Sequence, residues 1–248
     1  MQVVFVLSRP KDPRNVGAAA RAIKTMGFSQ LHIVGECDFK HEKALTLAHG
    51  AHDILESASR FSDLASATQG IDLLVGTTIR HRRLPIPYIN SHDLPAALAE
   101  KAGFVGTVAV VFGCETTGLS NQELSLCDLV TTIPTAGLYP SLNLSQSVMV
   151  LAYELAKIQD NAAMLTSDRR WLQGPGDGCQ LGVLKDKVRL LLKSLHTGDA
   201  TRLEMDTIRA ISRLGGTDMA LVYKLCGLVQ SGLEIDLPEV LEDSNPLR

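Results

Sequence analysis

Residues 139–147 read YPSLNLSQS, and this stretch marks the point where an apolar run stops and a long helical pattern begins. Two earlier segments occupy the same place in the pattern, NVGAAAR at residues 15–21 and VFGCETTGLS at residues 111–120. In an open α/β sheet, ligands are held where strands end, because backbone amides and short polar side chains gather there. Three such junctions with different polar side chains therefore predict one binding site built from separate parts of the chain.

Short apolar runs alternate with helical patterns through residue 157. The clearest strand is Val105–Phe112, an uninterrupted apolar run of the kind found in parallel strands that are covered on both faces. Helical stripes occupy residues 15–26 and 143–157. Strands separated by helices indicate a mostly parallel sheet, so we expect an α/β fold. The other expected strands are 3–7, 31–34, 71–75 and 129–133, and short helices are expected at 42–48, at 62–68 and after the capping box of Ser120 and Glu123.

The character of the chain changes after residue 160. Residues 161–180 include the run GPGDG at 174–178, which is typical of a linker. Three helical patterns follow, at 181–196, 201–214 and 217–231. We therefore expect a main domain at residues 1–160, a linker at 161–180 and a small helical C-terminal extension at 181–248.

Composition excludes several classes of protein. The chain has no apolar run long enough to cross a bilayer, and it begins with a strand pattern rather than a basic signal region. We therefore expect a cytoplasmic protein with no membrane partner. The five cysteines form no C-x-x-C pair and the histidines show no metal-ligand spacing, so no metal is expected.

The charge of the chain bears on nucleic-acid binding. A net charge of −3 argues against such a partner for the chain as a whole. Basic residues nevertheless cluster at 9–24 and at 80–83, and a phosphate backbone responds to a local basic patch. A solvated charged face remains the alternative for either cluster.

Common nucleotide and hydrolase motifs are absent from the sequence. Gly113 and Gly118 have the spacing of a phosphate-binding loop, but Leu119 and Ser120 replace the Lys-Ser/Thr pair that such a loop needs. No G-x-G-x-x-G follows the first expected strand, and neither G-x-S-x-G nor H-E-x-x-H occurs. Binding of a nucleoside triphosphate or a dinucleotide is therefore disfavoured.

The three junction motifs together resemble those of the SPOUT superfamily of RNA 2′-O-ribose methyltransferases. The motifs are N-x-G-x-x-A-R-A at 15–22, V-F-G-x-E-x-x-G-L-S at 111–120 and S-L-N-L-S at 141–145. Within that superfamily, RAIKTMG at 21–27 and GTTIRHR at 76–82 are most similar to the tRNA methyltransferases that act on the first nucleotide of the anticodon loop. The resemblance covers about residues 1–157.

The resemblance implies an α/β fold whose C-terminal part threads a loop into a trefoil knot. It also implies a homodimer, S-adenosyl-L-methionine (SAM) bound in the knot, and tRNA as substrate. Gly113 has a physical reason to hold the cofactor, because a residue without a Cβ lets the backbone approach a ligand closely, although a plain turn is the alternative. The implied cofactor-binding residues are Thr77, Thr78, Ile79, Gly113, Glu115, Gly118, Ile133, Ser141, Leu142 and Asn143.

Arg21 is the residue that the resemblance implies for chemistry, near the ribose and phosphate of the target nucleotide. A guanidinium stays protonated to about pH 12, so we expect it to clamp phosphate and stabilise a developing alkoxide, worth ~3 kcal/mol, rather than to act as a base. Asn15 is expected to hold Arg21 in place or to contact RNA. The alternative is that it is the N-cap of its helix. Arg82 matches an RNA-contacting position, and Ser141 contacts the substrate or only the turn. Asn143 faces the ligand, caps the following helix, or does both.

Other functions stay open at this point. Cys114 and residues 116–117 depart from the charged residues found at these positions in similar proteins, and we expect this to alter RNA contacts. Ribosomal RNA is an alternative substrate. A catalytically silent RNA-binding protein is a further alternative, although Arg21 and the intact SLN at 141–143 favour activity.

Overall fold

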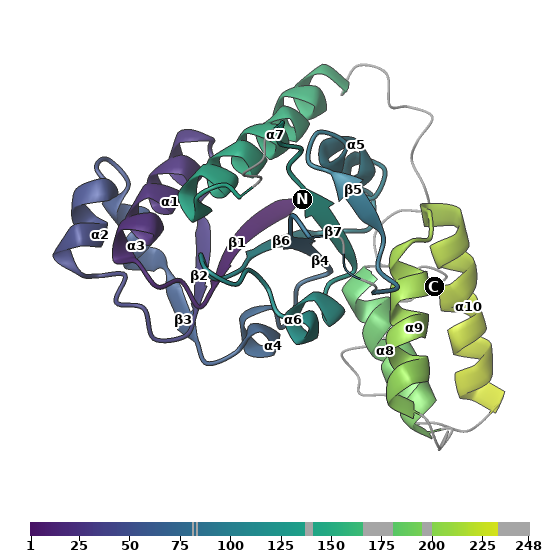
Figure 1. The fold of residues 1–248 in the computed structure, drawn as a ribbon. Coiled ribbons are helices and arrows are strands. Elements are labelled where there is room, and N and C mark those ends of the chain that lie inside the picture. Colours follow the sequence, from purple (N-terminus) through teal and green to yellow (C-terminus); the bar gives the residue numbers. More distant parts are fainter. Residues whose placement is uncertain (81, 83, 137–140, 166–180, 195–199, 233–248) are drawn as a thin grey trace. The chain divides into compact units, whose positions relative to one another are not determined.

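The computed structural model describes residues 1–248 except 81, 83, 137–140, 166–180, 195–199 and 233–248. The chain forms two compact units (Figure 1). The first comprises Met1–Ala99 and Thr107–Thr166, and the second comprises Glu100–Gly106 and Ser167–Arg248. The linker predicted at 161–180, and with it the predicted division of the chain, stays a prediction because residues 166–180 lie outside the described residues.

The first unit is built on a parallel sheet of seven described strands, in the order β3-β2-β1-β6-β4-β7-β5. Every strand pair is parallel, which confirms the predicted α/β class. Because the strands run the same way, their carboxyl ends meet at one edge of the sheet. The strands are β1 (Gln2–Ser8), β2 (Gln30–Val34), β3 (Ser59–Phe61), β4 (Leu73–Thr77), β5 (Tyr88–Asn90), β6 (Thr107–Phe112) and β7 (Leu129–Thr132).

Helices cover both faces of this sheet. Figure 1 shows α1 and α7, which pack against each other, on one face, and α4 and α6 on the other. None of the helices in the described ranges is both long and apolar enough to cross a membrane. The helices are α1 (Pro13–Thr25), α2 (Glu42–Leu47), α3 (His52–Ser57), α4 (Leu64–Ala67), α5 (Leu94–Ala99), α6 (Asn121–Ser125) and α7 (Leu144–Leu165).

Four elements of this unit were not predicted. The strands β3 and β5 have three residues each, too few to show an alternating pattern. The helices α3 and α5 have six residues each, less than two turns. A proline at position 95, in the first turn of α5, is the signal that could have located that helix.

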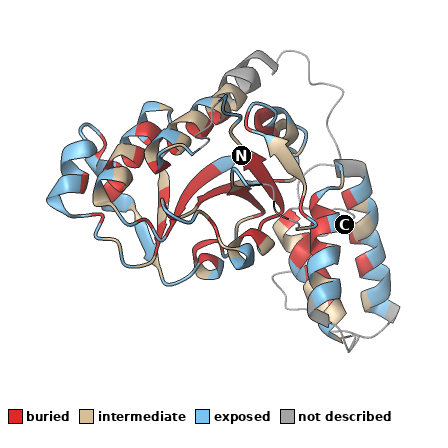
Figure 2. Cartoon of the chain, viewed as in Figure 1, coloured by how far each residue is buried: buried red, intermediate tan, exposed pale blue. Residues whose placement is uncertain are grey.

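The core lies between the central strands and the helices (Figure 2). The rings of Phe5 on β1 and Phe112 on β6 stack with centroids 6.3 Å apart. Gly17 lets α1 and α2 approach closely, because a Cβ at this position would come within 2.0 Å of the Ala44 carbonyl oxygen. The glycine of the N-x-G motif therefore serves helix packing.

The second unit contains the three predicted helices. They are α8 (Leu181–Ser194), α9 (Ala200–Ser212) and α10 (Gly216–Gly232), each within two residues of its predicted bounds. The Nζ atom of Lys187 on α8 donates a hydrogen bond of 2.7 Å to the Tyr223 hydroxyl on α10 and lies 4.2 Å from that ring's centroid. Both residues are buried, so this cation–π pair links α8 to α10.

Candidate functional site

An open pocket of about 440 Å³ lies where β4, β6 and β7 end. The segment after β4, the loop after β6 and the start of α7 all contribute to it, so the predicted junctions at 111–120 and 139–147 do converge. The lining of this pocket includes nine of the ten implied cofactor-binding residues, all except Asn143. The lining residues are Thr77, Thr78, Ile79, Arg80, Arg82, Phe112, Gly113, Cys114, Glu115, Thr116, Thr117, Gly118, Thr131, Ile133, Ser141, Leu142, Leu144 and Ser147.

The loop after β6 closes on itself. The Gly118 amide donates a hydrogen bond of 2.8 Å to the Cys114 carbonyl oxygen, and Gly118 has a φ of 68° that favours glycine. A Cβ on Gly113 would lie 2.1 Å from the Gly118 carbonyl carbon and 2.1 Å from the Leu119 amide nitrogen. The loop's own backbone therefore occupies the space that a Cβ would fill, which supports the turn alternative for Gly113, and its role toward a cofactor stays a prediction.

A chain of side-chain hydrogen bonds connects all three junction motifs. The Glu115 carboxylate accepts hydrogen bonds from the Lys11 amide at 2.9 Å, the Asp12 amide at 3.2 Å and Asn15 Nδ2 at 2.9 Å. Asn15 Oδ1 in turn accepts one from Asn143 Nδ2 at 2.9 Å. Burial opposes ionisation of Glu115, but these hydrogen bonds outweigh it and lower the pKa of its carboxyl group. The loop after β6 therefore carries an anion that fixes the start of α1, and α1 contacts the start of α7.

The structure decides whether Asn15 and Asn143 are helix caps. The N-cap of α1 is Asp12, which accepts from the Arg14 amide, so the N-cap interpretation of Asn15 was wrong. Asn143 does cap α7, since its Oδ1 accepts from the Ser145 amide at 2.9 Å. Asn143 thus combines a helix cap with the contact to Asn15.

Arg82 connects the segment after β4 to the loop after β6. Its Nη1 donates to Asn121 Oδ1 at 2.6 Å and its Nη2 to the Leu119 carbonyl oxygen at 2.9 Å. Its Nε is buried and has no hydrogen-bond partner within the described part of the chain. Arg82 therefore holds two walls of the pocket together, and its RNA contact stays a prediction.

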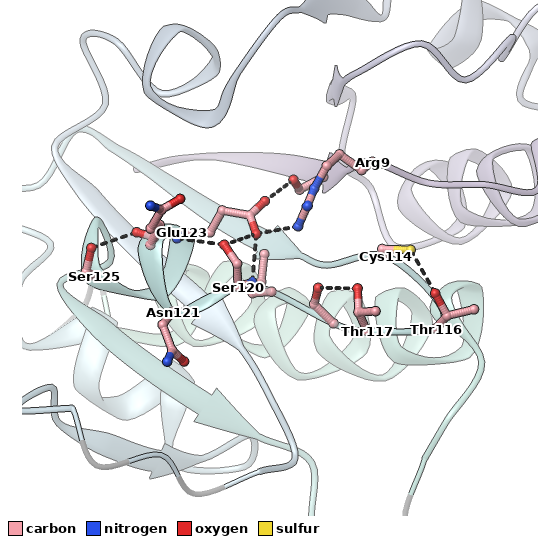
Figure 3. A network of polar contacts seen from close by, with 12 residues as sticks. Arg9, Cys114, Thr116, Thr117, Ser120, Asn121, Glu123 and Ser125 are labelled. Atoms are coloured by element: carbon pink, nitrogen blue, oxygen red, sulfur yellow. Dashed lines mark hydrogen bonds and ion pairs between the residues drawn. The ribbon is translucent and has the colours of Figure 1, made fainter.

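Sequence reasoning missed how many contacts Glu123 makes. The predicted capping box is present, since Glu123 accepts from the Ser120 amide at 2.7 Å and Ser120 Oγ accepts from the Glu123 amide at 3.2 Å. The same carboxylate also accepts from the Ser8 hydroxyl. It accepts from Arg9 Nη2 as well (Figure 3). Burial raises the pKa of Glu123, but these hydrogen bonds and the Arg9 charge lower it below its usual range. Arg9 has a φ of 54°, rare for a residue with a side chain, and no local motif signals this contact.

The departures at Cys114 and at residues 116–117 form part of the pocket wall. Cys114 Sγ lies 3.4 Å from Thr116 Oγ1 (Figure 3). Burial raises the pKa of the Cys114 thiol, but hydrogen bonds with Thr116 and Thr117 outweigh it, so that the pKa is lowered. These side chains are thus positioned to meet whatever the pocket binds.

The lining of the pocket also includes a buried hydroxyl group, on Thr131. Thr131 on β7 is 1% exposed, and its Oγ1 has no hydrogen-bond partner among the residues that the structure describes. Leaving such a group unsatisfied costs about 1–3 kcal/mol, so Thr131 is a candidate to bond a polar ligand. No three His, Cys, Asp or Glu side chains form a metal site within the described ranges.

Arg21 does not line this pocket in a single chain. The residue is exposed on α1, less than two turns beyond Asn15, and α1 packs against α7. The structure therefore brings together the implied cofactor residues and connects Asn15 to them, and leaves Arg21 on the outer surface of the unit. The predicted knot is not described, because residues 137–140 between β7 and α7 lie outside the described residues.

The sequence is similar to a family of methylases. The profile of the SpoU rRNA Methylase family matches residues 2–153. The chain is 36% identical over 225 residues to the Escherichia coli (strain K12) protein named uncharacterized tRNA/rRNA methyltransferase LasT, an alignment that spans 91% of this chain and 96% of LasT. It is 41% identical over 154 residues to the tRNA (cytidine/uridine/adenosine-2′-O-)-methyltransferase TrmJ of Pseudomonas aeruginosa (strain UCBPP-PA14). That alignment spans 62% of this chain and only 60% of TrmJ.

Solved structures share the fold. A probable methyltransferase from Bordetella pertussis Tohama I is 36% identical and has a TM-score of 0.58, covering 63% of this chain and 95% of its own. TrmJ from Z. mobilis ZM4 has a TM-score of 0.68 and covers 95% of this chain and 100% of its own. At 23% identity, this second likeness bears on the fold alone.

Proposed function

The chain belongs to the SpoU rRNA methylase family, and from this premise we propose that it transfers a methyl group from SAM to a ribose 2′-hydroxyl of tRNA. The target that the motifs favour is the first nucleotide of the anticodon loop. The single observation that carries the proposal is the pocket that the junction loops form, with Glu115, Asn15 and Asn143 connecting all three motifs. The names of the TrmJ relatives, which are tRNA 2′-O-methyltransferases, support the choice of substrate.

The lining of the pocket suits SAM. The walls combine apolar side chains, such as Ile133 and Leu142, with backbone groups of three loops and the Thr131 hydroxyl, which finds no partner among the described residues. A cofactor site usually combines apolar lining with placed polar groups, and this pocket offers both kinds of surface. When bound, SAM supplies a methyl group activated by a sulfonium. We propose that residues 77–79, 113–118, 133 and 141–143 hold it.

The reaction moves one methyl carbon from sulfur to oxygen. The sulfur–carbon bond breaks, a bond to the 2′-oxygen forms, and the 2′-hydroxyl proton leaves to solvent or a nearby acceptor. Arg21, Asn15, Arg82 and Ser141 are proposed to act on the RNA. A permanent cation such as Arg21 holds phosphate and stabilises negative charge on the 2′-oxygen, at about 3 kcal/mol by analogy with other oxyanion donors.

A homodimer is part of this proposal. Arg21 lies outside the pocket of its own chain, so we infer that a second copy presents its Arg21 to the pocket. The adjacent helices α1 and α7 carry small residues, and Tyr153 on α7 is 56% exposed, which makes this pair of helices suitable for subunit packing. Light scattering after size exclusion should give the mass of a dimer at micromolar concentration, and a monomer would refute the inference. We further propose that the protein acts in the cytoplasm.

Ribosomal RNA is the second candidate substrate. It is favoured by the description of the matching family and by the name of LasT, which leaves tRNA and rRNA open. The deciding experiment incubates the full chain with labelled SAM and total RNA, then maps the methylated nucleotide. A 2′-O-methyl group on tRNA supports the proposal, and one on rRNA selects the alternative. Binding of RNA without methylation would mark a silent RNA-binding protein.

A further inference from the structure

A second pocket of about 360 Å³ adjoins the first at the same edge of the sheet. Thr78, Ile79 and Arg80 line both pockets, so this short segment after β4 is their shared wall. The shared wall belongs to the motif GTTIRHR at 76–82, but half of the lining of the second pocket comes from the unpredicted β5 and the turn into α5, so the sequence did not predict this pocket. Its lining residues are Thr78, Ile79, Arg80, Tyr88, Ile89, Asn90, Asp93 and Thr132.

The backbone around this pocket is held firmly. The Ser91 amide donates to the Thr132 carbonyl oxygen at 2.8 Å, which fixes the end of β5 to β7. The Asp93 amide donates to the Asn90 carbonyl oxygen at 3.0 Å, and the Asp93 carbonyl oxygen accepts from the Ala97 amide at 3.1 Å as α5 begins. Asn90 and Asp93 therefore stand at fixed positions on the rim rather than on a long loop.

Three polar side chains in this pocket are open to a ligand. The Arg80 guanidinium and the Asn90 amide are exposed and make no side-chain hydrogen bond with any described residue. The Asp93 carboxylate is 58% exposed and, among the described residues, meets only His92, at 3.4 Å. A cation and an anion thus line one pocket without pairing with each other. Ile79, which is 41% exposed, adds an apolar surface beside them.

This combination matches a nucleotide better than a purely apolar or purely anionic ligand. A carboxylate accepts hydrogen bonds from the exocyclic amino group of a base, and a guanidinium binds phosphate. A side-chain amide can donate a hydrogen bond to a base or accept one from it. An aliphatic side chain can pack against a base, and single-stranded loops present bases splayed out of the stack. The pocket size lies in the range of small-ligand sites.

We propose that this second pocket binds the base of a nucleotide next to the methylated one, and that Asp93 favours a base that carries an amino group. The inference rests on the proposed function, because the shared wall at 78–80 joins the pocket to the methylation site. A carboxylate accepts from cytosine N4, whereas uracil offers a carbonyl oxygen at that position. The pocket therefore acts as a specificity site that prefers cytosine to uracil at one flanking position.

The test uses the full chain and RNA stem-loops that contain the mapped target nucleotide. Each flanking base is set to cytosine or uracil in turn, and kcat/KM for methylation is measured for each RNA. We expect the wild type to prefer cytosine roughly five- to tenfold at one flanking position, and Asp93→Asn to reduce that ratio to near one. The matched control is Glu56→Gln, which neutralises an exposed carboxylate on α3, away from both pockets.

A second readout separates RNA recognition from cofactor binding. The dissociation constant of SAM should be unchanged in Asp93→Asn and in Asn90→Ala. A weaker constant in these variants would assign the pocket to the cofactor and overturn the inference. An unchanged cytosine-to-uracil ratio in Asp93→Asn, with methylation intact, would also overturn it and would leave the proposed function standing. Absence of methylation by the wild type would instead overturn the proposed function, and the pocket assignment with it.

Discussion

Replacing Glu115 by glutamine tests whether one partly buried anion holds the three motifs together. The carboxylate accepts hydrogen bonds from two backbone amides and from Asn15. Glutamine has nearly the same shape but only one acceptor oxygen. If that oxygen keeps the partners of Oε1, Asp12 and Asn15, the amide nitrogen of glutamine faces the Lys11 amide, so two donors meet. The variant therefore loses the charge and at least one of the hydrogen bonds.

The expected cost follows from these contacts. Hydrogen bonds to a charged group contribute about 1.5–3 kcal/mol, and an unsatisfied donor costs a similar amount. Lys11 is exposed, so water replaces part of what its amide loses. We therefore expect Glu115→Gln to lower the free energy of unfolding by about 2 kcal/mol at pH 7, the lower part of that range. For a chain of this size, that corresponds to a fall of about 4–8 °C in Tm.

The pH dependence provides a sharper test than the value at pH 7. The folded-state pKa of Glu115 is lowered, so its contribution is complete above the usual glutamate pKa of about 4.3 and is lost as the pH falls through the lower folded value. The difference between the wild type and Glu115→Gln should thus be constant near neutral pH and shrink below about pH 4. Urea denaturation followed by circular dichroism at each pH measures it.

The control for this experiment is again Glu56→Gln, whose side chain is exposed and makes none of these contacts. It should change the free energy of unfolding by less than about 0.5 kcal/mol at any pH. A difference for Glu115→Gln that is equally small at pH 7, or that stays the same at low pH, would refute the reasoning. Either result would mean that the carboxylate does not stabilise the junction.

Three further predictions concern separate parts of the site. Arg21→Ala should leave the SAM dissociation constant nearly unchanged and lower kcat by ~100-fold or more, and an equal loss of both would assign Arg21 to folding or cofactor retention. Gly113→Ala should lower the free energy of unfolding, measured by urea denaturation, by at least about 3 kcal/mol, because the added Cβ meets rigid backbone. At Gly118 an added Cβ meets nothing within 4 Å, so Gly118→Ala should lower it by only about 1–2 kcal/mol, the cost of a positive φ. Equal costs would contradict the contact geometry of the loop. Ser120→Ala should lower the free energy of unfolding by about 1 kcal/mol, because it removes the cap of α6. An unchanged midpoint of urea denaturation would contradict this.

Local patterns predicted the elements that carry their own signals. In β6, residues Val108–Phe112 are all buried. Their continuous apolar run predicted a strand without any knowledge of the strands that pair with it. The capping box of Ser120 and Glu123 was likewise predicted correctly, because both residues lie within one turn. By contrast, β5 has only three residues, and its place at the end of the sheet depends on pairing with β7. Such a strand exists because a neighbour supplies its hydrogen bonds.

The sequence by itself determined that strands and helices alternate, that polar motifs follow the strand ends, and which family these motifs resemble. These features depend on residues a few positions apart. Only the tertiary structure decided that Glu115 reaches Asn15, that Asn15 reaches Asn143 and that Glu123 reaches Ser8, contacts between residues 100, 128 and 115 positions apart. The register of a parallel sheet and the packing of its helices bring such residues together. No local pattern encodes that distance, because it is set by the whole set of strand pairings at once.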